Sequence, residues 1–396
     1  MKVWILGASR TPIGRFLGDF SNIPAPMLAG VSIRRTIERT QIDPSRIQEL
    51  WIGNVLSAGV GQAPAKQASL HGGLGQGVTC TQVSKVCGSG LEAVVLAVRA
   101  LQSGQASACI AAGMESMSQA PHLLVNSRMG TKYGSVAMLD SIDQDGLRCS
   151  QGNVAMGTYA DQLACQQSIS RSDQDAWALT SHQRACAASD QGFFEQEIAP
   201  MLIDAKTTIR RDACPRQDTS LEKLAKLKPA FGPLGSVTAG NASGLADGAA
   251  SLLVVDEPVR QTLSIQCSFR VLACAHHSQS PAELFTAPVE AIRKVCRYAN
   301  LAPEDVDLFE INEAFATQVI ACVNQLGIAP ERVNVHGGAI ALGHPIGCSG
   351  TRILVTLMHA MERYGKRLGV ASLCIGGGEA VAIAIEQEPN TVKSGH

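Results

Sequence analysis

The stretch that decides the fold is VCGSGLEAVVLAVRAL at residues 86–101, because its pattern occurs a second time in the chain. Ser89-Gly90 matches Ser349-Gly350 at an offset of 260 residues. Each pair opens an apolar stretch of helical period, LEAVVLAVRAL in the first copy and TRILVTLMHAM in the second. Each stretch then leads into an expected strand, followed by a turn of small residues with a glutamate. Matches in this order indicate two homologous halves.

The repeat continues upstream at an offset of 259 residues, where Ile33-Arg34-Arg35 matches Ile292-Arg293-Lys294. Pro44 matches Pro303 at the same offset. Further pairs at this offset are Ile42 with Leu301, Ile47 with Val306 and Ile52 with Ile311. In each copy this pattern therefore predicts a helix, followed by a proline-containing turn and then a buried strand.

The chain has 396 residues, which is too long for one ordinary core. Alternating strands and helices predict an α/β fold of two duplicated βαβ halves with layered helices and sheets. We expect the N-terminal half at residues 1–120, the C-terminal half at residues 250–396 and an inserted loop domain at residues 121–249. The best helix of the insertion is expected at residues 172–191, with Ser172-Asp173-Gln174 as its capping sequence and Gly192 as its stop.

Charge and cysteine content limit the classes of partner. The 33 basic and 34 acidic residues leave a formal charge of −1, without a long run of one sign, so neither nucleic acid nor an anionic membrane is expected as a partner. The apolar run near the N-terminus is too short for a signal-peptide core. Thirteen cysteines without CxxC pairs are typical of a reducing compartment and give no metal-ligand spacing. We therefore expect a cytoplasmic protein without a metal site.

Polar residues flanked by glycines at strand-to-helix turns are the expected ligand positions of α/β proteins, because helix N-terminal N–H groups are free there. The stretches with this character are VCGSG at 86–90, INEAFA at 311–316, GGAIALGHPIGCSG at 337–350 and CIGGGEA at 374–380.

Cys87 lies just ahead of the helix expected from Gly90. We expect the helix dipole and free amides to lower the pKa of its thiol and make it nucleophilic. The alternative is that Cys87 is a small buried hydrophobe, as most cysteines are.

His344 lies in a Gly-His-Pro turn, and Cys374 ends an expected strand before three glycines. His344 could equally be a structural loop histidine. His336 and His71 each precede a Gly-Gly pair and are weaker candidates. Asn312-Glu313 follows another expected strand and could bind a ligand or cap a helix.

The opening stretch also contains G-x-G-x-x-A, a pattern found in dinucleotide-binding domains. Glu115, 22 residues after Ala93, even mimics the acidic residue of such a site. The preceding VTCTQVSK is too polar for the buried strand that the fingerprint requires. We therefore attribute the glycines to Cys87, whose backbone would face an oxyanion. A serine hydrolase is disfavoured because no G-x-S-x-G precedes a helix.

The four glycine-flanked stretches are VCGSG at 86–90, INEAFA at 311–316, GGAIALGHPIGCSG at 337–350 and CIGGGEA at 374–380. In this order and spacing they resemble the thiolase family, in particular its short-chain acetyl-CoA acetyltransferases. RTPIGRFLG near the start, AGMESMSQAPH at 112–122 and LKPAFGPLGSVTAGNASGLADGAA at 227–250 extend the resemblance over the whole chain. The resemblance implies a reversible Claisen condensation of two acetyl-CoA to acetoacetyl-CoA and CoA. It also implies the duplicated thiolase fold with a loop domain, homo-oligomers (dimers or tetramers) and no cofactor beyond the CoA thioesters themselves.

The resemblance assigns roles to individual residues. Cys87 would take the acyl group with His344 as its base, and Cys374 would be the second acid/base. Asn312 would hold a water at the enolate, and the N–H groups of Cys87 and Gly376 would bind the tetrahedral oxyanion. The residues that would contact CoA are Ser243 at the pantetheine, Leu147 and Met156 as its walls, and Arg216 near the nucleotide.

The acyl pocket departs from the short-chain pattern. Ala155 stands where close relatives often have histidine, and Leu284-Phe285 stands where many have Met-Gly. Both changes leave slightly longer or 2-methyl-branched 3-ketoacyl-CoA substrates open as an alternative. A more remote alternative is a non-catalytic acyl-CoA or lipid carrier on the same fold. Ketoacyl-carrier-protein synthases share this fold but place histidines or His/Asn, rather than a second cysteine such as Cys374, beside the nucleophile.

Overall fold

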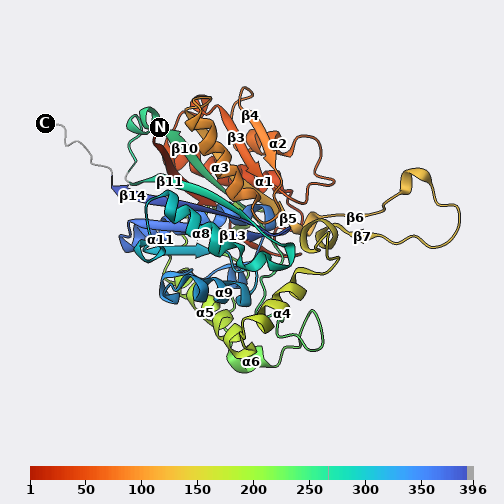
Figure 1. Ribbon diagram of the computed structural model, residues 1–396. Coiled ribbons are helices and arrows are strands. Elements are labelled where there is room, and N and C mark those ends of the chain that lie inside the picture. Colours follow the sequence, from red (N-terminus) through yellow and green to blue (C-terminus); the bar gives the residue numbers. More distant parts are fainter. Residues whose placement is uncertain (266, 390–396) are drawn as a thin grey trace.

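The computed structural model describes residues 1–265 and 267–389. Figure 1 shows a mixed α/β molecule in which one half of the chain lies above the other. The first half contributes β1 (Val3–Arg10), β3 (Glu49–Gly53), β4 (Thr79–Val83), β5 (Ala108–Ser116) and β10 (Ala246–Asp256). The second contributes β11 (Cys267–Ser278), β12 (Leu308–Ile311), β13 (Leu368–Ile375) and β14 (Glu379–Pro389).

The strand order is the same in both halves. In the first it is β1-β10-β5-β3-β4, with β10 antiparallel to both neighbours and β3 parallel to both of its own. In the second it is β11-β14-β13-β12, with the corresponding directions. The counterpart of β4 is a single parallel bridge from Val333 to Phe309. The halves join where β1 pairs with β11 at Trp4 and Ile5.

The helices repeat with the strands. They are α1 (Ala25–Thr40), α2 (Pro64–His71) and α3 (Ser89–Gln102) in the first half, and α8 (Ala287–Tyr298), α9 (Ala316–Leu326) and α11 (Ile346–Tyr364) in the second. Pro44 and Pro303 each begin a 3-10 turn before β3 and β12. The duplication predicted from the sequence is thus present in the fold.

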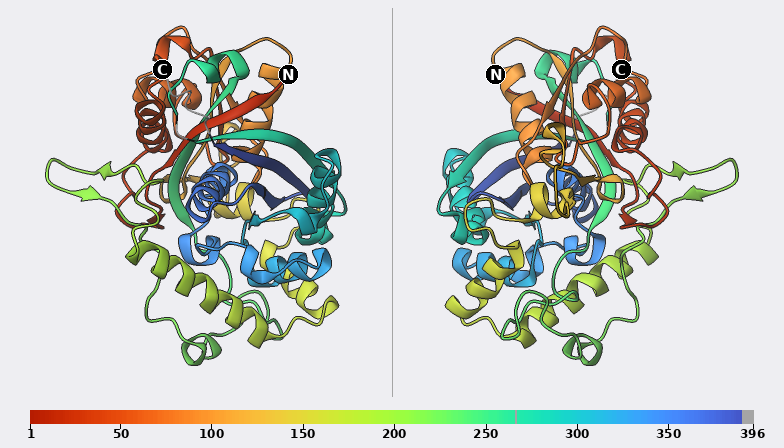
Figure 2. Two further views of the ribbon diagram at one scale, coloured as in Figure 1. Left: turned by 90° about the vertical axis from the view of Figure 1, so that its left-hand side faces the viewer. Right: turned by 90° about the vertical axis from the view of Figure 1, so that its right-hand side faces the viewer.

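The layers follow from alternate faces of the strands. Ala250, Leu252 and Val254 of β10 face a core that contains α3 and α11, whereas Ala249, Leu253 and Val255 face α1 and α2. Helices α3 and α11 lie together at the centre of the molecule. On the side of the second half, β13 and β14 separate α11 from α8 and α9. Helix α11 is therefore buried along most of its length between the two halves of the continuous sheet (Figure 2).

Close approach of α3 and α11 explains the repeated glycines. A Cβ at Gly90 would lie 2.6 Å from Thr351 Oγ1, and a Cβ at Gly350 would overlap the backbone nitrogen of Leu91. A Cβ at Gly88 would overlap the side chain of Ile375. The expectation that these glycines serve an oxyanion is therefore wrong for Gly88 and Gly90, whose space is taken by neighbouring side chains and helices.

The segment between β5 and β10 forms the inserted part. It contains α4 (Met156–Gln166), α5 (Arg171–Asp190), α6 (Leu221–Ala225) and the short hairpins β6 (His122–Leu123) with β7 (Leu139–Asp140) and β8 (Met201–Leu202) with β9 (Thr208–Ile209). The β6–β7 arm projects from the body in Figure 1. Helix α5 begins one residue earlier than expected because Ser170, not Ser172, caps it in a capping box with Asp173.

Four further short elements connect the larger helices and strands. They are β2 (Gly14–Arg15), α7 (Glu257–Gln261), α10 (Ala339–Leu342) and a π-helical turn at Ile142–Leu147.

The expected domain boundary at residues 249/250 falls inside β10, which pairs with β1 and β5 of the first half. Within the described residues, no helix combines the length and apolar character needed to cross a bilayer.

Candidate active site

Cys87 lies in a tight turn between β4 and α3. Val86 before it has φ +47°, a conformation that is strained for a β-branched residue. Ser89 holds the turn, because its Oγ donates to Val86 O (2.7 Å) and accepts from Lys85 N (2.8 Å). The turn places Cys87 at the start of α3 with its side chain half-buried.

The thiol of Cys87 is not acidic. Burial raises its pKa to about 11, although hydrogen bonds from the backbone N–H groups of Gly376 and Cys87 act in the opposite direction. The expectation that the helix start lowers this pKa is therefore wrong, because loss of solvation outweighs the dipole and amides. Cys87 is a neutral thiol at rest and needs a base to become a nucleophile.

His344 can supply that base. Its backbone N–H donates to Gly244 O (2.9 Å), and Gly343 before it has φ +96°. Its Nδ1 lies 2.5 Å from Ser349 Oγ, and that hydroxyl donates to Pro345 O (2.9 Å). Because the hydroxyl proton is directed to Pro345 O, we assign the imidazole proton to Nδ1, which leaves the lone pair on Nε2.

The Nε2 atom of His344 is buried and has no hydrogen-bond partner among the described residues. Burial, with a smaller contribution from the Arg352 guanidinium, lowers the pKa of His344 to about 4. The imidazole is therefore neutral near pH 7, and its Nε2 is available as a proton acceptor.

Cys374 is the second thiol of the site. It is the penultimate residue of β13 and is buried, and burial together with the nearby Cys87 and Cys322 raises the pKa of its thiol well above the usual range. The turn that follows needs glycine, because Gly377 and Gly378 have φ +97° and +94°. This turn carries Gly376, whose N–H points at the Cys87 thiol.

One cavity of ≈ 250 Å³ brings most of the predicted site residues together. Cys87, His344, Cys374 and Gly376 line it. The predicted substrate-contacting residues that also line it are Ser243, Leu147, Met156, Leu284 and Phe285. Its walls are largely apolar, so it is suited to an acyl chain beside the reacting groups.

Asn312 and Arg216 do not line this cavity. Asn312 is buried directly after β12, and neither atom of its side-chain amide has a partner among the described residues. It does not cap α9, whose N-cap is Phe315. Arg216 lines an adjoining cavity of ≈ 180 Å³ that shares Ala242, Gly244 and Leu245 with the first.

Two aromatic residues of the cavity were not predicted. Phe231 comes from the insertion and Phe315 from the start of α9, and their rings meet edge to face at 6.0 Å. Phe285 packs on Phe315 in the same way at 5.3 Å. Both lie within stretches quoted above for the resemblance, but nothing in their local sequence indicates that they meet.

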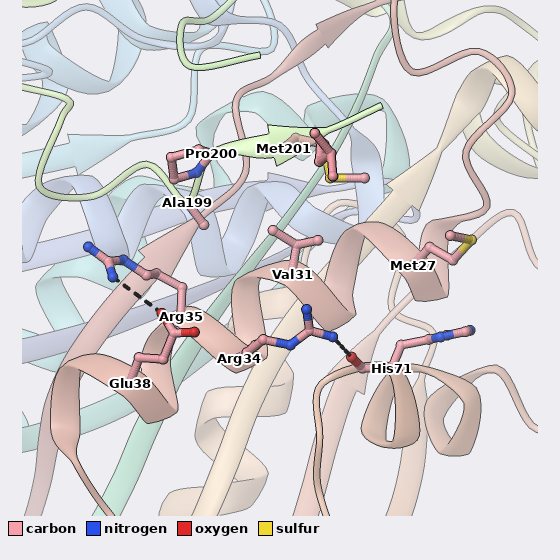
Figure 3. A pocket seen from close by; sticks show the side chains of 10 residues that line it. Met27, Val31, Arg34, Arg35, Glu38, His71, Ala199, Pro200 and Met201 are labelled. Atoms are coloured by element: carbon pink, nitrogen blue, oxygen red, sulfur yellow. Dashed lines mark hydrogen bonds and ion pairs between the residues drawn. The ribbon is translucent and has the colours of Figure 1, made fainter. Parts of the chain in front are cut away.

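The competing histidines lie elsewhere. His336 packs among aromatic rings, 5.3 Å from Phe193, and its Nε2 lies 3.2 Å from Tyr364 Oη. His71 lines a larger groove of ≈ 520 Å³ beside α1 (Figure 3). That groove contains none of the other predicted site residues, and its Arg34 and Arg35 bind His71 O and Glu38. Size alone would therefore select the wrong cavity.

The dinucleotide alternative does not fit this geometry. The space at Gly88 and Gly90 is filled by protein, and Glu115 is fully buried and hydrogen-bonded within the chain. A pyrophosphate cannot reach these glycines, and a ribose cannot reach this carboxylate.

Comparison with known proteins agrees with the geometry. Two family profiles match the chain, described as "Thiolase, N-terminal domain" over residues 3–258 and "Thiolase, C-terminal domain" over residues 265–387. An acetyl-CoA acetyltransferase of Escherichia coli K12 is 45% identical over 387 residues, which cover 97% of this chain and 98% of that protein. A probable acetyl-CoA acyltransferase of Staphylococcus epidermidis RP62A is 45% identical, with 98% and 99% covered.

Two solved structures share the whole fold. The acetyl-CoA acetyltransferase from Syntrophomonas wolfei superposes with a TM-score of 0.94 at 36% identity and covers 98% of this chain and 99% of its own. Human mitochondrial 3-ketoacyl-CoA thiolase gives a TM-score of 0.93 at 35% identity, with 97% and 98% covered. With both family profiles matched and such coverage, the chain belongs to the thiolase family of acyltransferase enzymes.

Proposed function

We propose that the protein is an acetyl-CoA C-acetyltransferase that interconverts two acetyl-CoA with acetoacetyl-CoA and CoA through an acyl-Cys87 intermediate. The observation that carries this proposal is the meeting of Cys87, His344 and Cys374 in one largely apolar cavity. A neutral base, a thiol that can take the acyl group and a second thiol that can exchange a proton are the groups that an acyl transfer followed by a carbon–carbon bond formation requires.

In the first half-reaction, His344 Nε2 takes the proton of the Cys87 thiol, and the thiolate attacks the thioester carbonyl carbon. The N–H groups of Cys87 and Gly376 bind the oxyanion. The bond to CoA then breaks, and the departing CoA thiolate takes the proton of the Cys374 thiol. The products are acetyl-Cys87, free CoA, a Cys374 thiolate and an imidazolium at His344.

In the second half-reaction, the Cys374 thiolate removes a proton from the methyl group of the second acetyl-CoA. The enolate oxygen is stabilised by the imidazolium of His344 and by a water that Asn312 holds. The enolate carbon attacks acetyl-Cys87, the carbon–sulfur bond breaks, and the Cys87 thiolate recovers its proton from His344. All three groups thereby return to their starting states, so protons and electrons balance.

The side-chain amide of Asn312 has no hydrogen-bond partner among the described residues, which supports its assignment to the enolate water, because a buried amide of this kind is commonly satisfied by a bound water. For CoA, we propose that Ser243, Leu147 and Met156 contact the pantetheine. Arg216 would then lie near the nucleotide, as its position in the adjoining cavity supports.

The test of the function is to incubate the enzyme with radiolabelled acetyl-CoA and to isolate the labelled peptide. Label on the Cys87 peptide, released on addition of CoA, is the expected result. An enzyme that cleaves acetoacetyl-CoA without acquiring this label, or that binds acetyl-CoA without turnover, would contradict the proposal. The second outcome would favour the carrier alternative.

A second candidate is a thiolase for slightly longer or 2-methyl-branched 3-ketoacyl-CoA. It is favoured by the apolar side chains of Leu284 and Phe285 in the cavity wall and by the small side chain of Ala155, which lines the same cavity. A steady-state comparison of acetoacetyl-CoA, 2-methylacetoacetyl-CoA and 3-ketohexanoyl-CoA in the thiolytic direction separates the two. The highest kcat/KM identifies the acyl group.

We also propose that the enzyme is cytoplasmic and forms a homotetramer or dimer. The thirteen free cysteines support a reducing compartment. The β6–β7 arm supports assembly, because Met129 and Tyr133 on it are 87% and 101% exposed. Light scattering of the full chain and of a chain with a shortened arm tests the assembly. A monomeric full chain would contradict it.

A further inference from the structure

Glu115, the acidic residue in AGMES, has no part in the chemistry described so far. It lies near the end of β5, is completely buried and accepts four hydrogen bonds. Its Oε1 accepts from Asn54 Nδ2 (2.6 Å) and Leu56 N (3.1 Å). Its Oε2 accepts from Val55 N (3.1 Å) and Gly347 N (2.9 Å). All of its partners are donors, so the ionised carboxylate suits this site.

The donors belong to both halves of the molecule. Asn54, Val55 and Leu56 follow β3, and the backbone N–H of Asn54 donates to Val83 O (3.1 Å), four residues before Cys87. Gly347 lies in the first turn of α11, three residues after His344. A continuous series of hydrogen bonds therefore runs from the segment before Cys87, through Asn54 and Glu115, to the segment after His344.

Packing at Gly347 leaves little room for adjustment. A Cβ there would lie 2.7 Å from Met114 O and 2.9 Å from Glu115 Oε2. The start of α11 is thus pressed against the end of β5, and a carboxylate at this position also suits the positive end of the helix dipole. Burial is the main cause of the raised pKa of Cys87, and the negative charge of Glu115 adds a smaller contribution in the same direction.

We propose that Glu115 is a positioning residue for the acyl transfer: its charged carboxylate joins the segment after His344 to the segment before Cys87 and so sets the imidazole against the thiol, while its negative charge adds to the burial that disfavours the Cys87 thiolate. This inference rests on the proposed function. It differs from a purely structural role, because it requires both the bonds and the charge of Glu115.

The main variant is Glu115→Gln, which keeps the shape, removes the charge and turns an NH₂ group towards N–H donors. We expect kcat for acetoacetyl-CoA cleavage to fall about 10- to 100-fold, as for lost supporting hydrogen bonds elsewhere, with KM nearly unchanged. The alkylation of Cys87 by iodoacetamide, followed on its peptide by mass spectrometry, is expected to shift to lower pH. The sign follows because removing a nearby negative charge lowers the pKa of the thiol.

The matched control is Glu313→Gln. Glu313 is also buried and accepts four hydrogen bonds, from Trp177 Nε1, Ser181 Oγ, Asn334 Nδ2 and Ile340 N. We expect a similar loss of stability in urea but an unmoved Cys87 alkylation profile. Burial raises the pKa of Glu115 to about 7, so profiles are compared above about pH 8, where the wild-type carboxylate is charged. Asp247 is the further acidic group whose charge acts on Glu115.

Two further variants keep the inference testable if Glu115→Gln does not fold. Asn54→Ala and Glu115→Asp retain the charge but weaken the bonds, so kcat is expected to fall while the alkylation profile stays in place. An unmoved profile in Glu115→Gln, or wild-type kcat in Glu115→Asp, would overturn the inference. If wild type does not cleave acetoacetyl-CoA but the alkylation profile still shifts, the proposed function fails and the effect of Glu115 on Cys87 stands.

Discussion

The two halves of the molecule have one topology but unequal chemistry. At the start of α3 the first half presents Cys87, and at the start of α11 the second half presents His344. With Ser89 matched to Ser349, Cys87 corresponds to Gly347 and His344 corresponds to Ser84. The same helix start therefore carries different reactive groups, and neither half contains a complete site. Duplication supplies two facing positions, and local sequence decides what each one does.

The difference extends to the turns before the helices. Cys87 follows a residue held at φ +47°, Val86, whereas His344 follows a glycine at φ +96°. The second half also supplies Cys374 from the end of β13 and Gly376 from the turn that follows it, and the first half does not match them with reactive groups. The comparison predicts that, in the first half, substitution of one residue causes most of the loss of activity. In the second half, substitutions at several residues are each expected to lower the activity.

The largest effect is expected from Cys87→Ala, since this removes the only reactive group that the first half is proposed to supply. The expected loss of kcat for acetoacetyl-CoA cleavage is at least about a thousandfold, as for removal of other enzymic nucleophiles. Cys165→Ala, at an exposed cysteine, is the control and should retain activity. Wild-type cleavage by Cys87→Ala would exclude the proposed acyl-enzyme.

His344→Ala is expected to lower kcat about 10²- to 10⁴-fold, because the neutral thiol of Cys87 then lacks its proposed base. His336→Ala removes another buried histidine, outside the cavity, and is expected to reduce the urea midpoint rather than kcat. Equal kcat losses in the two variants would mean that His344 acts through the fold rather than through its Nε2.

The repeat could be predicted from the sequence itself, whereas the grouping of Cys87, His344 and Cys374 in one site was implied by the resemblance to the thiolase family. The structure places the three side chains in one cavity. The sequence did not predict the contacts of Phe231 and Phe315, which come from the insertion and from α9. No local pattern determines such contacts, since they depend on how the insertion folds back over the sheet.

Two physical expectations failed for related reasons. The pKa of Cys87 was expected to be low, but the degree of burial is a property of the whole fold and cannot be obtained from a helix start. The sequence pattern predicts that Gly88 and Gly90 make room for an oxyanion, but Ile375 and Thr351, from distant parts of the chain, occupy that space. Sequence motifs thus located the site, while solvation and packing required the structure.

The alkylation of Cys87 by iodoacetamide tests the protonation state of the thiol that the first half supplies to the site. Because its pKa is raised to about 11 and that of His344 is lowered to about 4, the pair is neutral at rest. The rate at Cys87 is expected to rise about tenfold per pH unit from about pH 7 to 10 without reaching a plateau, following the thiolate fraction. A plateau below about pH 8 would instead indicate a thiolate–imidazolium pair.

Gly90→Ala and Gly350→Ala test the close contact between α3 and α11, where each half contributes the same Ser-Gly pair. Each added methyl group meets the opposite helix, so each variant is expected to lose about 1–3 kcal/mol of unfolding free energy in urea, as for overpacked cores. Gly75→Ala is the control, since a Cβ at that position meets nothing within 4 Å. If the unfolding free energy fell in only one of the two variants, the structure around the other added methyl group would be able to adjust without cost.

The smallest effect is expected from the paired serines. Ser349→Ala removes the partner of His344 Nδ1, so kcat should fall about tenfold, as for lost supporting hydrogen bonds to histidine ligands, while the rate of Cys87 alkylation stays constant. Ser89→Ala removes the two bonds that hold the Val86 turn and should instead change the rate of Cys87 alkylation. If Ser349→Ala changed the rate of Cys87 alkylation and Ser89→Ala did not, the start of α11 would influence the thiol at the start of α3. The division of roles between the two halves would then be wrong. If each variant affects only its own half, the repeated serine supports a different reactive group in each copy.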